Sequence, residues 1–169
     1  MVLGLQKLKE KTQMEYVLLR FGERLVTQIL NALRQDSRFI ELDGRWFLRQ
    51  LAAFPTEAQL GFLAWEMVSL HEPRSTLDLV PLIQPPLTAG DAGLFGLYLA
   101  LRQHSELFGN ADPGLRPRWR LVGPPPGAGT ARNAAYDPAT YTVLCMPGET
   151  LAPELVERLW GLELLESIL

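Results

Sequence analysis

The side chains best suited to chemistry in this sequence are polar and basic groups near residue 30. Arg24, Gln28 and Asn31 recur at intervals of three or four residues, which places them on one face of a helix. Arginine binds phosphate oxygens, and glutamine and asparagine read base edges in duplex DNA. The predicted nucleic-acid-binding residues are Arg24, Gln28, Asn31, Arg34, Arg38 and Arg45. An ordinary solvated face fits them nearly as well, and the sequence leaves both interpretations open.

No pattern in the sequence predicts catalysis or metal binding. His71 and His104 have no Cys, Asp or Glu at ligand spacing on the same helix, and Cys145 lies in an apolar run typical of a buried, inert thiol. The Gly/Pro-rich segment 123–129 mimics a phosphate-binding loop, but Thr130 stands where that loop needs Lys. We therefore expect a non-enzymatic protein with no catalytic residues, no metal, no cofactor and no small-molecule substrate.

A tandem repeat organises the elements that must position these groups. The string ALRQ-x-S occurs at Ala32 and again at Ala100, each time followed by Phe and then by Arg-Trp-x-Leu. Both copies follow apolar residues at i, i+3, i+4 and i+7, an amphipathic-helix spacing, 68 residues apart. These residues are Val26, Ile29, Leu30 and Leu33, then Leu94, Leu97, Tyr98 and Leu101. Each copy predicts a helix followed by a two-stranded hairpin, and Asp43-Gly44 predicts a tight turn in the first.

Further helices complete the second copy better than the first. The segments 57–70, 75–83 and 88–102 read as three successive helices. In the first copy, 14–19 matches the second helix and only 2–11 remains for a first. Either that helix is short or another part of the chain completes the unit.

The stretch DSRFIELDGRWFL, from Asp36 to Leu48, resembles the wing of the HARE-HTH group and of the N-terminal domain of the RNA polymerase delta subunit. In that group an Arg-Phe begins one strand and Gly-x-Trp/Tyr-x-Leu forms the other. The resemblance implies a winged-helix fold and binding of nucleic acid or of transcription machinery, with no catalysis.

The predicted fold class is mainly α with small β-hairpins: two winged-helix modules plus a C-terminal strand and helix. The expected boundaries are a first module over 1–52, a second over 53–122, a Pro/Gly linker over 123–135 and a strand-helix segment over 136–169. Tyr141 to Met146 supplies the expected strand, and Pro153 suits the first turn of the final helix.

Two apolar helices point to further contacts. The run from Leu94 to Ala100 is apolar on every side, and Leu155, Leu159, Leu162 and Leu169 form a second stripe. Such helices must be buried within the chain or across an interface, so a homodimer or a protein partner is expected. Arg116, Arg118 and Arg120 alternate along the second wing, where they either contact phosphates or keep an edge strand soluble.

Charge and composition narrow the class of protein. The net charge of −3 divides into +3 over residues 1–50, −2 over 51–122 and −4 over 123–169, so a polyanion should prefer the N-terminal third. One cysteine excludes an intrachain disulfide and fits a reducing cytoplasm, and no run is long enough to span a membrane. Two functions remain: a transcription-associated DNA-binding protein, or a protein-interaction scaffold without DNA contact.

Overall fold

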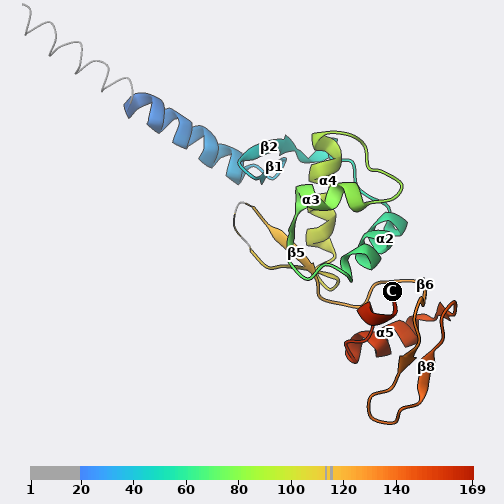
Figure 1. Ribbon diagram of the computed structural model, residues 1–169. Helices are drawn as coiled ribbons and strands as arrows, with labels where there is room; N and C mark the ends of the chain where they lie inside the picture. The colour runs from blue at the N-terminus through green and yellow to red at the C-terminus, as the bar shows by residue number, and fades with distance from the viewer. Residues whose placement is uncertain (1–19, 113, 115) are drawn as a thin grey trace, which may run out of the picture.

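The computed structural model describes residues 20–112, 114 and 116–169. A helix over residues 20–35, here called the projecting helix, extends away from the rest of the molecule (Figure 1). The two helices expected over 2–11 and 14–19 lie outside the described residues. The remaining chain folds into a hairpin, a central helical unit and a C-terminal unit.

The first hairpin follows the projecting helix directly. Strands β1 (Phe39–Leu42) and β2 (Arg45–Leu48) pair antiparallel, with Ile40 opposite Phe47. Asp43 and Gly44 both have positive φ, 54° and 72°, as a tight two-residue turn requires. The hairpin predicted at this place is confirmed. A short 3-10 helix, η1 (Arg49–Leu51), leads away from it.

The central unit contains three helical segments and a three-stranded sheet. Side-chain caps begin two of the helices: Thr56 with Gln59, and Ser75 with Asp78, each form a reciprocal capping box. The three predicted helices and the second antiparallel hairpin are confirmed, and the sheet order is β3-β5-β4. The elements are α2 (Glu57–Met67), β3 (Arg74–Ser75), α3 (Thr76–Leu79), η2 (Val80–Leu82), α4 (Asp91–Gln103), β4 (Phe108–Asn110) and β5 (Arg118–Leu121).

The core of this unit forms around α4 and the second tryptophan. Trp119 packs edge-on against Tyr98 of α4, with ring centroids 6.3 Å apart. Its indole N–H donates to the Thr76 hydroxyl over 2.9 Å, which satisfies the polar group in the buried site. Leu97 and Leu101 of α4 are fully buried in the same cluster.

The opposite side of α4 is covered by the first hairpin. Phe47 stacks on Phe95 with ring centroids 4.9 Å apart, in a cluster that also includes Ile40 and Leu42. Next to this contact, Gly96 lies so close to the backbone of Ala53 that a Cβ at this position would collide with the Ala53 carbonyl. The expected burial of the apolar helix therefore takes place within the chain, because α4 is enclosed on two sides.

The C-terminal unit contains more strands than the sequence predicts. Strand β6 (Gly129–Thr130) pairs with β9 (Thr150–Leu151), and β7 (Ala135–Tyr136) pairs with β8 (Val143–Cys145). The unit also contains α5 (Pro153–Gly161) and the 3-10 helix η3 (Glu166–Ile168). Cys145, Leu151, Leu159 and Ile168 are buried in its core. Pro153 occupies the first turn of α5, as predicted.

The prediction of a mainly α fold is wrong. Nine strands in four small sheets occur among the described residues, so the protein is not plainly mainly α. The strand expected over 141–146 is present as β8, and three further strands accompany it, two of which use residues of the Pro/Gly segment. Strands of two or three residues are too short to show a period of two in the sequence, which explains the error. The segment also packs on α2, where the Trp65 indole N–H donates to the Pro126 carbonyl over 3.1 Å.

Candidate interaction surface

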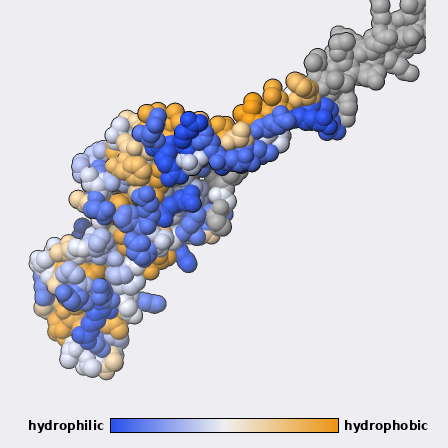
Figure 2. Space-filling view, turned by 180° about the vertical axis from the view of Figure 1, so that it is seen from behind, coloured by the Kyte–Doolittle hydropathy of each residue, from blue (hydrophilic) through white to orange (hydrophobic). Residues whose placement is uncertain are grey.

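The projecting helix has an uncovered apolar face. Phe21, Leu25, Val26 and Ile29 are spaced to share one side of the helix, and each leaves between 47% and 66% of its surface exposed. Figure 2 shows this side as an orange edge along the helix, with a blue edge opposite. Helix faces of this kind usually form part of a core, and this one has no cover among the described residues.

The repeat shows how unusual this exposure is. Val26 and Ile29 correspond to Leu94 and Leu97 of α4, 68 residues later. In α4 both positions are buried, with Leu97 packed among side chains of α2 and α3. The described part of the chain supplies no comparable helical layer for the projecting helix. Its prediction as an amphipathic helix is confirmed, whereas its burial in a first core is not found there.

A polar face beside this apolar one carries three of the predicted nucleic-acid-binding residues. Arg24, Gln28 and Asn31 are all exposed. No ion pair joins Arg24 to another residue in the described ranges. These side chains are available for hydrogen bonds to an approaching molecule.

The next two predicted residues are engaged by neighbouring carboxylates. The Arg34 guanidinium donates to both carboxylate oxygens of Glu41 over 3.1 and 3.4 Å. Arg38 binds the Asp36 carboxylate at 2.6 Å. Hydrogen bonds from the Arg38 side chain, and then from its backbone N–H, lower the pKa of Asp36 to about 2. Each arginine must leave its carboxylate before it can bind a phosphate fully.

Arg45 is also paired, on another surface. Its guanidinium lies 2.5 Å from the Asp91 carboxylate at the start of α4. In the hairpin, Arg45 pairs with Leu42, and Glu41 pairs with Trp46. Because adjacent residues of a strand point to alternate faces, Arg45 and Glu41 lie on different faces of the hairpin. The predicted site is thus divided: three residues share one exposed face of the projecting helix, whereas Arg34 of the same helix, Arg38 and Arg45 are held in ion pairs.

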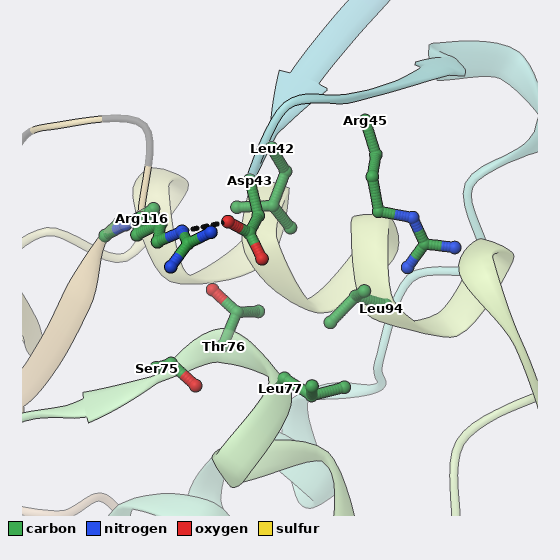
Figure 3. Close-up of a pocket in the computed structure, with 9 residues that line it drawn as sticks. Leu42, Asp43, Arg45, Ser75, Thr76, Leu77, Leu94 and Arg116 are labelled. Atoms are coloured by element: carbon green, nitrogen blue, oxygen red, sulfur yellow. Dashed lines mark ion pairs between the residues drawn. The ribbon is translucent and has the colours of Figure 1, made fainter.

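A cavity beside Arg45 was not predicted from the sequence. It encloses about 240 Å³ where the first hairpin meets α3 and the segment before β5 (Figure 3). Asp43 at the turn of the first hairpin forms an ion pair with Arg116 across it. The partners are 73 positions apart, so no local spacing indicates them. Both leucines and charged side chains line the cavity. The lining residues are Leu42, Asp43, Arg45, Ser75, Thr76, Leu77, Leu94, Arg116 and Pro117.

Other kinds of site are not found in the described ranges. There, no group of three or more His, Cys, Asp or Glu side chains is placed to hold a metal ion. None of the helices in the same ranges combines the length and the hydropathy that crossing a bilayer demands. The exposed surfaces of the projecting helix are therefore the strongest candidates for function.

Comparisons with protein-family models, with curated proteins and with solved structures found no match to this chain.

Proposed function

We propose that this protein is a non-enzymatic interaction module that binds a partner protein through the apolar face of the projecting helix. One observation carries the proposal: Phe21, Leu25, Val26 and Ile29 are exposed together on a helix that extends from the body. Leaving such a face in water is unfavourable by about 25 cal/mol per Å² of apolar area. A partner that covers it recovers this free energy on binding.

The mode of binding that fits this face is a helix laid against an apolar surface. Leu25 and Ile29 are one turn apart, and Phe21 is one turn before them, so the three side chains form a continuous ridge. A complementary groove would accept them as anchors at regular intervals. Leu97 of α4, the counterpart of Ile29, is already covered by packing of this kind against α2.

Cross-linking from defined positions of the full chain tests this function. A photoreactive amino acid at Ile29 would report on the apolar face, and the same group at Asn31 would serve as the matched control on the polar face. We expect an adduct with a protein from position 29 in the native cells, and none from position 31. Equal labelling from both positions, or no adduct from either, would contradict the proposal.

A second candidate function is DNA binding by a transcription-associated protein. The exposed Arg24, Gln28 and Asn31 on the polar face favour it, as does the wing resemblance over residues 36–48. The ion pairs of Arg34, Arg38 and Arg45 reduce the positive charge that a DNA backbone would meet. For this reason we place the interaction module first. The two functions use different side chains on neighbouring faces of the same helix.

We also propose a fold type for residues 57–121 and a cellular location for the protein. The order helix, strand, helix, helix, strand, strand over residues 57–121 supports an assignment of this part to the winged-helix type. The one cysteine of the chain, Cys145, is a buried free thiol, which supports a location in a reducing cytoplasm.

A further inference from the structure

A second exposed apolar surface lies at the far end of the molecule, on the hairpin of β7 and β8. Tyr136 and Val143 are cross-strand partners, Tyr141 lies in the turn between the strands, and Met146 follows β8. Each leaves 51% or more of its surface exposed. This hairpin patch and the projecting helix lie at opposite ends of the ribbon in Figure 1.

The segments that carry the two surfaces have net charges of opposite sign. The projecting helix holds three arginines and one glutamate, a net charge of +2, whereas residues 123–169 have a net charge of −4. Glu149, Glu154 and Glu157 of the C-terminal unit are all exposed. Apolar surfaces flanked by opposite charges attract each other and disfavour pairing of either surface with itself.

We propose that the apolar face of the projecting helix binds the β7–β8 hairpin patch of a second copy of this chain, and that two copies exchange this contact reciprocally. The inference rests on the proposed function, since it names the partner of the same helix face. The proposed dimer is two-fold: the helix of each chain binds the hairpin patch of the other.

The area available favours the reciprocal arrangement over a simple pair of helices. A helix of 16 residues is about 24 Å long and about 10 Å across. One such contact buries roughly 500 Å² over both partners, well below the ~1,200 Å² at the lower end of stable interfaces. Two projecting helices paired on a two-fold axis would make that contact once. Reciprocal exchange makes the contact twice and reaches roughly 1,000 Å², which suits a weak, reversible dimer.

The positions of the two surfaces allow both contacts to form together. A two-fold axis through the middle of the dimer brings the helix end of one copy to the hairpin end of the other, and the reverse. This arrangement requires the two surfaces to lie far apart on one chain, as they do in Figure 1. A helix close to its own hairpin would instead cover it within the same chain.

Sedimentation equilibrium of the purified full chain tests the dimer first. We expect the wild type to dimerise at micromolar to submillimolar concentrations, and two uncharged variants to raise the dimer Kd at least tenfold, a shift of about 1.4 kcal/mol. The variants are Leu25→Gln with Ile29→Gln on the helix, and Tyr141→Ser with Val143→Thr on the hairpin. Asn31→Gln on the polar face is the control and should leave the Kd unchanged.

Circular dichroism and thermal unfolding establish whether each variant is folded, since all four replaced side chains are exposed. A wild type that stays monomeric throughout this range would overturn the proposal. A dimer weakened by the helix variant and unaffected by the hairpin variant would overturn it as well, because that result indicates pairing of the helices with each other.

Cysteine cross-linking identifies the contact directly, because Cys145 is buried and the chain has no other cysteine. Two tagged chains, one with Ile29→Cys and one with Tyr141→Cys, are mixed and oxidised. We expect disulfides between positions 29 and 141 of different chains; links between two copies of position 29 would contradict the exchange. Failure here, together with an adduct to another protein from position 29 in cells, would reject the dimer and retain the proposed function.

Discussion

Arg45 of the first hairpin lies 2.5 Å from Asp91, the residue that begins α4, across 46 positions of sequence. Asp91 also lies in the first turn of α4, where a carboxylate stabilises the helix by interacting with the unpaired backbone N–H groups. The pair therefore attaches the hairpin to the helix whose side it covers. Arg45 is assigned a structural contact here, whereas the sequence predicts a phosphate contact.

A double-mutant cycle measures this attachment. We expect Arg45→Ala, Asp91→Ala and the double variant to give a coupling free energy of about 0.2–1 kcal/mol in urea unfolding, because both side chains are about half exposed and water screens the pair. Perfectly additive effects of the two substitutions would show that the pair contributes nothing to stability.

The pH dependence of stability should reveal the pair of Asp36 and Arg38. The pKa of Asp36 is about 2 in the folded chain against an ordinary value of 3.8. Its contribution to stability is therefore present above pH 3.8 and is lost as the pH falls from about 3.8 to about 2. In Arg38→Ala, a carboxyl NMR titration should place the pKa of Asp36 closer to 3.8. A value that remains near 2 would mean that the backbone N–H alone lowers it.

Gly96 is expected to tolerate no side chain. A methyl group there would meet the Ala53 carbonyl, so Gly96→Ala should lower the free energy of unfolding by about 1–3 kcal/mol through forced displacement of the 52–54 segment. Gly61→Ala in α2 is the matched control, since its nearest neighbour is Pro126 Cγ at 3.6 Å. Helix propensity should make that variant up to about 1 kcal/mol more stable. Equal effects of the two substitutions would contradict the close approach.

The buried hydrogen bond between Trp119 and Thr76 should be costly to remove. Thr76→Val preserves the side-chain shape and leaves the indole N–H without an acceptor, so we expect a loss of about 1–3 kcal/mol in chemical denaturation. Thr76→Ser keeps the hydroxyl and should recover part of that loss. If valine and serine destabilise equally, the missing methyl packing matters and the hydrogen bond does not.

Salt titration of duplex binding tests the second candidate function. Each phosphate contact contributes about −0.9 to the slope of log K against log salt concentration. If DNA binds the polar face of the projecting helix, Arg24→Glu should weaken binding and make the slope less negative by about one unit. Arg34→Glu with Arg38→Glu should have a smaller effect per residue, because both arginines are already paired. Absence of duplex binding by the wild type at low salt would reject this function.

The parts of the fold that the sequence predicts well are those with strong periodic signals. The spacing of Leu97 and Leu101 identifies α4, and Asp43-Gly44 identifies the first turn. Of the four short strands of the C-terminal unit, only β8 was predicted; β6, β7 and β9 are two residues long and cannot establish a period. The same limitation produced the incorrect mainly α assignment.

The candidate site was predicted only in part, for a different reason. The sequence correctly places Arg24, Gln28 and Asn31 on one helix, since helical periodicity is local. It could not indicate that Arg45 would pair with Asp91 or that no described residue would cover the apolar stripe. Ion pairs between distant segments, and the absence of a covering element, depend on how the whole chain packs.

The double enclosure of α4 has a consequence for how the protein unfolds. One side of the helix belongs to the core with α2 and Trp119, and the other belongs to the cluster with Phe47 of the first hairpin. Opening either cluster removes half of the packing that holds α4 in place. The first hairpin and the central unit should therefore melt as one cooperative block, with the amides of α4 the slowest to exchange with deuterium, while the projecting helix opens independently.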